Sequence, residues 1–175
     1  MRTVTTAILI VLLLTAAGCV KKENPTPRIS LQAAAVQGNL EVIRQHIKAG
    51  SDLNEKDAYG STPLIVAITF NKIDVARALI EAGADITITN NDESTPLHIA
   101  AFLCRIEILE ALLDNGADKN IKNNRGATAL EVAEAPFEDV KPVYDAIGKG
   151  LAPLGLELDY DLIKMTRPKV AEMLR

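Results

Sequence analysis

The stretch Ser94-Thr95-Pro96-Leu97-His98-Ile99-Ala100-Ala101 decides the fold, because its opening returns at a constant interval along the chain. Threonine recurs in this block at Thr62, Thr95 and Thr128, and neighbouring copies lie 33 residues apart. Other residues keep the same phase: Gly50, Gly83 and Gly116; Asp52, Asp85 and Asp118; and Ala34, Ala67, Ala100 and Ala133. Agreement between several residue types indicates an internal repeat rather than chance.

Each repeat carries the signals of two short helices. Thr62 precedes Pro63, and a threonine side chain caps the first N–H groups of a helix while proline suits its first position. Apolar residues then recur at helical spacing, which predicts a second, outer helix. These residues are Ile73, Val75, Ala76, Leu79 and Ile80 in one repeat, and Ile106, Ile108, Leu109, Leu112 and Leu113 in the next. Gly83 and Gly116 accept positive φ, so we expect them to end these outer helices.

The repeat resembles the ankyrin family, most closely in the stretch 94–101 and in Asn115-Gly116-Ala117-Asp118. The resemblance covers about residues 30–147 and implies an all-α ankyrin-repeat solenoid of stacked helix-turn-helix units with short hairpin-like fingers. Such small units bury their apolar faces only against their neighbours. We expect about four units, at 29–60, 61–93, 94–126 and 127–147, the last degenerate because Pro136 and Pro142 interrupt it.

The two ends of the array depart from the repeat. The first unit lacks the Thr-Pro pair and carries Gln45 and His46 on its outer helix, and polar side chains suit a face that no neighbour covers. After residue 147 the pattern stops, and apolar residues around Pro168 predict one or two amphipathic segments. We expect residues 148–175 to form a helical cap over the last repeat. A partner-binding tail is the alternative.

The N-terminal segment has the pattern of a secretion signal. An apolar run, Ala7 to Leu14, follows Met1-Arg2 and is shorter than the roughly 18 residues that span a bilayer. The next residues, Ala16-Ala17-Gly18-Cys19, resemble a bacterial lipobox, which implies a signal peptide at 1–18 and a lipid on Cys19. Ordinary secretion and an uncleaved anchor are the alternatives. Residues 19–28 are polar and contain prolines, which predicts a flexible tether.

The residue after the predicted lipidation site bears on location. In Gram-negative lipoproteins, which the motif resembles, an acidic residue there would favour retention at the inner membrane. Val20 occupies that position. The resemblance therefore implies a lipid-anchored protein of the bacterial envelope, on the periplasmic face of the outer membrane if the cell is Gram-negative.

Composition argues against nucleic acid as the partner. The chain has 19 lysines and arginines against 23 aspartates and glutamates, for a net charge of −4. No basic stripe offers contacts to phosphates. With Cys19 committed to lipid, Cys104 stands alone, so no intramolecular disulfide forms in the mature chain. Packing must then supply the stability of one domain, which we expect to be monomeric.

The chain shows no pattern of catalytic, metal-binding or cofactor-binding residues. The histidines are His46 and His98, and the second has a structural role in the consensus that the repeat resembles. The recurring aspartates sit in predicted turns, which they are expected to shape. Asp159-Tyr160-Asp161 supplies two carboxylates without further placed ligands. We therefore expect no enzyme, no metal and no cofactor.

Cys104 departs from the repeat at the turn between the two helices, where Gly38 and Asn71 stand in earlier units. If that turn needs positive φ, Cys104 carries a strain of about 1 kcal/mol. A reactive regulatory thiol is the alternative reading, although no neighbouring basic group is identified that would lower its pKa.

Ankyrin proteins, by resemblance, bind other proteins through the finger tips and the exposed side of the inner helices. The three phenylalanines, Phe70, Phe102 and Phe137, all fall at or next to one edge of that surface. Exposed aromatics rimmed by polar residues have the composition of a binding hot spot. The alternative is that the C-terminal segment covers these rings. The predicted partner-binding residues are Lys56, Tyr59, Phe70, Asn91, Asp92, Phe102, Leu103, Asn124 and Arg125.

These features favour a lipid-anchored module that acts by steric binding or inhibition of a protein in the envelope. One version is an immunity protein against a toxin or lipase that acts in the periplasm. Another is a scaffold that stabilises a resident envelope enzyme or complex. A third, from a different class, is small-molecule or metal sensing through the C-terminal segment.

Overall fold

The computed structural model describes residues 26–175, and every regular element in that part of the chain is helical. The predicted signal peptide, Cys19 and the tether up to residue 25 lie outside the described residues. The elements are α1 (Leu31–Gln37), α2 (Leu40–Ala49), α3 (Pro63–Thr69), α4 (Ile73–Glu81), α5 (Pro96–Phe102), α6 (Ile106–Asp114), α7 (Ala129–Glu134), α8 (Phe137–Leu151), the 3-10 turn η1 (Ala152–Leu154) and α9 (Tyr160–Leu174).

The helices begin and end where the repeat predicts. The hydroxyl oxygens of Thr62, Thr95 and Thr128 accept hydrogen bonds from N–H groups at the starts of α3, α5 and α7. Gly83 and Gly116 adopt positive φ, at 84° and 80°, at the second residue past the ends of α4 and α6. The predicted caps and helix ends are therefore confirmed.

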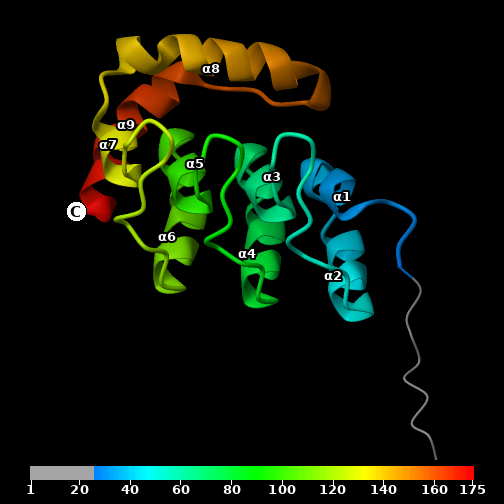
Figure 1. Cartoon of the computed structure of the whole chain (residues 1–175). Coiled ribbons are helices and arrows are strands. Elements are labelled where there is room, and N and C mark those ends of the chain that lie inside the picture. The colour runs from blue at the N-terminus through cyan, green and yellow to red at the C-terminus, as the bar shows by residue number, and fades with distance from the viewer. Residues whose placement is uncertain (1–25) are drawn as a thin grey trace, which may run out of the picture.

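The helices form two stacked rows (Figure 1). In the inner row α1, α3, α5 and α7 contact one another in sequence, and in the outer row α2 contacts α4 and α4 contacts α6. One apolar core runs between the rows and draws fully buried side chains from every repeat. Because each unit contributes only one side of this core, stability comes from stacking neighbours. The predicted all-α solenoid is confirmed.

The C-terminal segment caps the array by two separate contacts. α8 runs along the top of the array and α9 returns beside α7, so that the C-terminus lies next to the last inner helix (Figure 1). α9 contacts α7 and α5 and places Val170, Ala171 and Leu174 in the same core as the repeats. It thus closes the core at the place where the fourth unit has no outer helix of its own.

Two expectations about the ends need correction. Pro142 does not interrupt a helix but lies inside α8. Because α8 runs from Phe137 to Leu151, the boundary expected after residue 147 falls within this helix. His46 is buried rather than exposed. Its Nε2 donates to the Ile29 carbonyl at 2.8 Å and its Nδ1 pairs with the Ser51 hydroxyl at 2.9 Å, because the chain entering the first repeat crosses its ring. Across residues 26–175, every helix is too short or too polar to span a membrane.

Candidate partner-binding site

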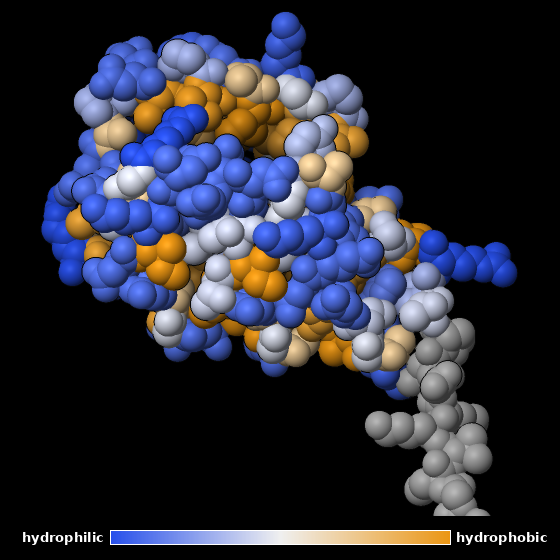
Figure 2. Space-filling model, viewed as in Figure 1, coloured by the Kyte–Doolittle hydropathy of each residue, from blue (hydrophilic) through white to orange (hydrophobic). Residues whose placement is uncertain are grey.

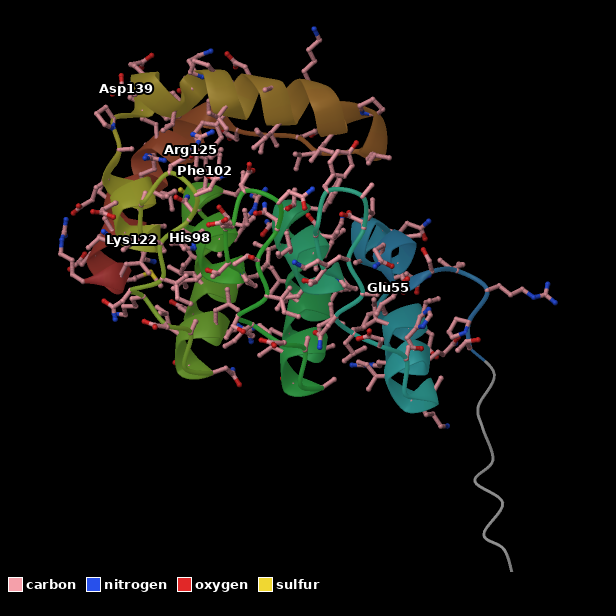
Figure 3. The ribbon with its side chains drawn as sticks, in the orientation of Figure 1. Glu55, His98, Phe102, Lys122, Arg125 and Asp139 are labelled. Atoms are coloured by element: carbon pink, nitrogen blue, oxygen red, sulfur yellow. The ribbon has the colours of Figure 1, made fainter. Side chains whose placement is uncertain are left out.

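The finger tips carry six of the nine predicted binding residues, and all six are exposed. Lys56 and Tyr59 lie on the first finger, and Tyr59 has 75% of its surface exposed. The remaining four are Asn91 and Asp92 on the second finger, and Asn124 and Arg125 on the third. Figure 3 shows Arg125 beside the top of α5, near Phe102.

One side chain shapes each finger. The carboxylate of Asp57 accepts hydrogen bonds from the N–H groups two and four residues later. Asn90 and Asn123 make the same pair of bonds in the second and third fingers. Our sequence reasoning missed these three positions, although their 33-residue spacing and their turn-forming side chains were a usable signal. The tips are thus turns with a fixed backbone.

Neighbouring fingers are hydrogen-bonded to one another, and we call the segments 57–61, 90–94 and 123–127 together the finger ladder. The Asn91 N–H donates to the Tyr59 carbonyl at 3.2 Å, and the Asn124 N–H donates to the Asp92 carbonyl at 3.1 Å. The side-chain amide of Asn91 also reaches the Ala58 carbonyl at 3.4 Å. The ladder therefore presents its exposed side chains from a continuous support.

The recurring aspartates shape the turns before the fingers, as predicted. Asp52, Asp85 and Asp118 each accept a hydrogen bond at 2.8 Å from the backbone N–H two residues later. Bonds from the Thr87 hydroxyl and N–H lower the pKa of Asp85, because they stabilise its carboxylate. These carboxylates are therefore engaged in local structure.

The predicted row of exposed aromatic residues is wrong. Leu103 is 2% exposed and packs in a small second core with Tyr144 and Ile163. The ring of Phe102 stacks on Tyr144 with centroids 4.2 Å apart, and Phe137 also stacks on Tyr144, at 5.7 Å. Phe70 is partly buried against the main core. The alternative, in which the C-terminal segment covers the rings, holds for Phe102 and Phe137, because stacking under α8 removes aromatic surface from water.

Tyr144 and Arg167 hold the C-terminal helices against the repeats. The Tyr144 hydroxyl donates to the Phe102 carbonyl and accepts from Arg167 Nη1 at 2.9 Å. Arg167 Nη2 donates to the carbonyls of Val132 and Ala135, at 2.8 and 2.6 Å. Arg167 is only 5% exposed. Its guanidinium is stabilised by carbonyls at the C-terminal end of α7, where the helix dipole is negative. Sequence reasoning missed this pair because neither Tyr144 nor Arg167 stands at a position that recurs in the other repeats.

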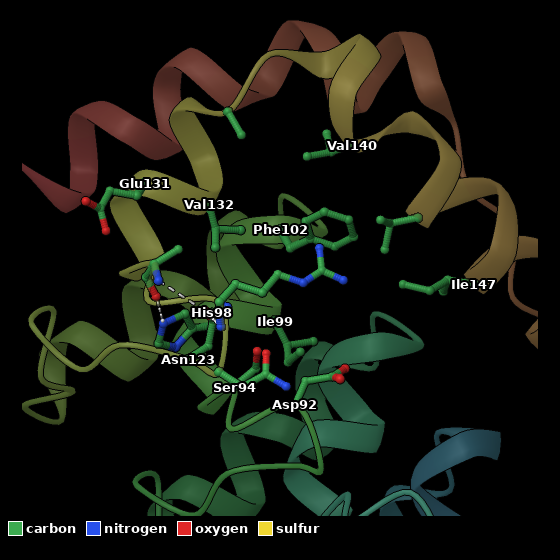
Figure 4. A pocket seen from close by; sticks show the side chains of 15 residues that line it. Asp92, Ser94, His98, Ile99, Phe102, Asn123, Glu131, Val132, Val140 and Ile147 are labelled. Atoms are coloured by element: carbon green, nitrogen blue, oxygen red, sulfur yellow. Dashed lines mark hydrogen bonds between the residues drawn. The ribbon is translucent and has the colours of Figure 1, made fainter.

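α8 leaves an open pocket between itself and the repeats, which we call the α8 slot. It has a volume of about 210 Å³. Figure 4 shows Val140 and Ile147 on the α8 side, with Phe102, Ile99 and Val132 on the repeat side. Figure 2 shows an apolar surface with a hollow beneath the α8 ridge. Three residues of the finger ladder, Asp92, Asn124 and Arg125, also line the slot.

Two polar side chains that line the slot, His98 and Glu131, form hydrogen bonds within the protein. Burial lowers the pKa of His98, so the ring is neutral at pH 7. The Thr95 N–H donates to His98 Nδ1 at 3.2 Å, and Nε2 donates to the Ala127 carbonyl at 3.0 Å, which ties the third repeat to the fourth. Glu131 accepts from the Thr128 N–H at 2.7 Å, and that bond lowers its pKa. His98 and Glu131 are therefore engaged in structure.

Cys104 has the strained backbone that its position predicts, with φ at 55°. Burial raises the pKa of its thiol to about 11. Because the thiolate is the reactive form, a raised pKa argues against the alternative of a regulatory thiol.

Asp159, one of the two carboxylates considered as a metal site, has a structural role. The Asp159 side chain accepts from the Leu162 N–H at 2.9 Å and caps α9. Within residues 26–175, no group of three histidine, cysteine, aspartate or glutamate side chains is placed to hold a metal ion.

Comparison with known families identifies the repeats. The family model described as ankyrin repeats (3 copies) matches residues 7–90, 31–123 and 84–135, which together span more than half of the chain. None of the curated proteins matches the chain. The chain belongs to the ankyrin-repeat family, whose repeats generally mediate protein–protein interaction.

Proposed function

We propose that this protein is a lipid-anchored module of the bacterial envelope that binds another protein and blocks its working surface. The observation that carries the proposal is the exposed finger ladder. Its side chains, among them Tyr59 and Arg125, project from a backbone that is hydrogen-bonded within and between fingers. A support that is ordered before binding reduces the entropic cost of forming a complex. Tyrosine and arginine are also enriched at binding hot spots.

The proposed anchor raises the effective concentration of the module at the membrane. The sequence Ala16-Ala17-Gly18-Cys19 supports the proposal of an anchor, with Cys19 as the lipid acceptor. An inhibitor held there meets a membrane-attacking enzyme where that enzyme works. The concrete form of the proposal is therefore an immunity protein, active as a monomer, against a toxin or lipase that acts in the periplasm.

The test of binding is cross-linked capture from intact cells that express the tagged full chain. Wild type is compared with a finger variant, Tyr59→Ala with Arg125→Glu, and with a matched outer-helix control, Arg77→Glu. Arg77 is exposed on α4, a helix of the outer row, and does not belong to the finger ladder. We expect one envelope protein to be recovered with wild type and with the control but not with the finger variant. Equal recovery with all three forms contradicts the proposal.

The test of inhibition uses the captured protein. We expect its activity to fall when the full chain is added, and to stay unchanged with the finger variant. A rise in the activity or the half-life of the captured protein would instead indicate that the chain acts as a scaffold. Lipid attachment is tested separately by incorporation of labelled palmitate, which we expect in wild type and not in Cys19→Ser.

A further inference from the structure

The apolar face of α8 and the apolar surface of the repeats beneath it are in contact only in part, which leaves the α8 slot between them. Val143 and Ile147 of α8 line the α8 slot and are partly buried, yet neither belongs to the apolar cores formed by the described residues. Across the slot, Ile99 and Phe102 are also partly buried. Protein interiors are normally filled to crystal-like density. These side chains therefore present an apolar surface that a further apolar group would cover.

The size of the slot limits that group. An apolar cavity of roughly 150 Å³ is large enough to bind benzene. The α8 slot has about 210 Å³. It accepts one phenylalanine-sized side chain and is too small for a folded element such as a helix, whose diameter is roughly 10–12 Å.

Among residues 26–175, no side chain engages the guanidinium of Arg125 at the mouth of the slot. The Arg125 guanidinium lines the slot and makes neither an ion pair nor a side-chain hydrogen bond with any other residue of 26–175. Its planar fork of donors suits a carboxylate. Asp92 and Glu131 also line the slot and repel carboxylates, so an acidic group must contact Arg125 directly and a second one close by is disfavoured. The mouth therefore suits a single acidic group beside an apolar one.

The slot is continuous with the proposed interface. Asp92, Asn124 and Arg125 belong to the finger ladder and to the slot at the same time. A protein that docks on the ladder therefore brings its own surface to the mouth of the slot.

We propose that the α8 slot receives one phenylalanine-sized apolar side chain from an extended segment of the partner protein, while Arg125 binds a carboxylate next to that side chain. This inference rests on the proposed function and specifies the chemistry of the partner. α8 is then part of the recognition surface as well as part of the cap.

The first test titrates short peptides into the full chain, purified in detergent with labelled valine and isoleucine methyl groups. The probe is acetyl-Gly-Asp-Phe-Gly-amide, with Asp→Lys and Phe→Ser versions as controls. We expect the probe to shift the methyl signals of Val143 and Ile147, with both controls at least about five-fold weaker, because each lacks one of the two contacts. Shifts confined to other sites overturn the proposal.

The second test fills the slot. Val143→Phe and Ile147→Phe each place a ring in the slot, whereas Ala146→Phe places the same ring on the exposed side of α8. We expect the first two to bind the probe at least about ten-fold more weakly than wild type and the third to match wild type. Arg125→Gln should weaken the probe about five-fold, and Asp92→Asn should not weaken it. Equal loss in Ala146→Phe contradicts the proposal, as does unchanged binding in both filling variants.

The outcomes separate this inference from the proposed function. If capture of the partner depends on the finger residues but not on Val143→Phe or Ile147→Phe, the inference is wrong and the proposed function stands. If the probe binds in the slot but no protein is captured, the proposed function fails while the chemistry of the slot stands. If toluene enters the slot and the peptide does not, the slot is a small-molecule pocket and the inference is wrong.

Discussion

The central repeats and the C-terminal cap solve the same packing problem by different means. In α3 to α6 the apolar side chains recur with the repeat, and each helix pair is buried by an equivalent neighbour. In the cap, α9 adds apolar residues to that core. α8 and α9 are held in place, however, by two buried residues, Tyr144 and Arg167, that have no equivalent in the other repeats. The difference shows that a repeat array can be closed by polar contacts to backbone carbonyls where no further repeat follows.

The largest effect is expected from Leu109→Ala in the central repeats. Leu109 is fully buried in α6, and removing a buried leucine leaves a cavity that costs about 3 to 4 kcal/mol. Because the repeats share one core, hydrogen exchange should accelerate in α4 and α5 as well as in α6. Urea unfolding measures the total loss in the free energy of unfolding. Leu162→Ala, at a position 55% exposed, is the control and should cost under about 0.5 kcal/mol.

A smaller and more local effect is expected from Arg167→Ala in the cap. The change leaves the Val132 and Ala135 carbonyls and the Tyr144 hydroxyl without this donor, which should cost about 2 to 3 kcal/mol. Exchange should accelerate in α7, α8 and α9 and stay slow in α3 and α4. Lys169→Ala, exposed on the same helix, is the control. Uniform acceleration through all repeats would show that cap and repeats unfold as one unit.

The cap should also respond to alkaline pH. Burial raises the pKa of Tyr144 from 10.0 to about 12, because the neutral phenol is favoured in the folded state. Its contribution to stability is therefore complete below pH 10 and is lost as pH rises through 12, by at most about 3 kcal/mol. Urea unfolding at a series of pH values measures this loss. Tyr144→Phe should show a smaller loss over the same interval, whereas an unchanged pH profile would exclude Tyr144 as its source.

The sequence predicts the two regions to very different extents. Thr95 and Gly116 could be assigned as a cap and a helix end because the chemistry recurs at a fixed interval and depends on the local backbone. The same reasoning located the exposed fingers, including Tyr59 and Arg125. It could not locate Leu103 or Phe102 correctly, because their burial depends on Tyr144, which is about 40 residues away and has no equivalent in the other repeats. The α8 slot is formed by that same distant contact and was missed for the same reason.

The smallest expected effect concerns positions where the repeat is regular in backbone but not in sequence. Glu93 adopts φ 57°, while Gly60 and Gly126 occupy the equivalent finger positions with φ 72° and 73°. A left-handed backbone destabilises a residue with a Cβ by about 1 kcal/mol, and glycine removes this strain. Glycine also makes the unfolded chain more flexible, which offsets part of the stabilisation. Glu93→Gly should therefore stabilise the protein by about 0.5 kcal/mol, measured by urea unfolding.

Cys104→Gly is the comparison that sharpens this prediction, because Cys104 has nearly the same φ, 55°, but a different environment. Its thiol packs between the two cores and lies 3.6 Å from the Ile163 carbonyl in α9. Glycine would relieve the backbone and remove these contacts, so we expect it to stabilise the protein less than Glu93→Gly, or to destabilise it. If both changes stabilise the protein equally, the thiol contributes nothing to the contact between repeat and cap, and Tyr144 and Arg167 hold the cap without it.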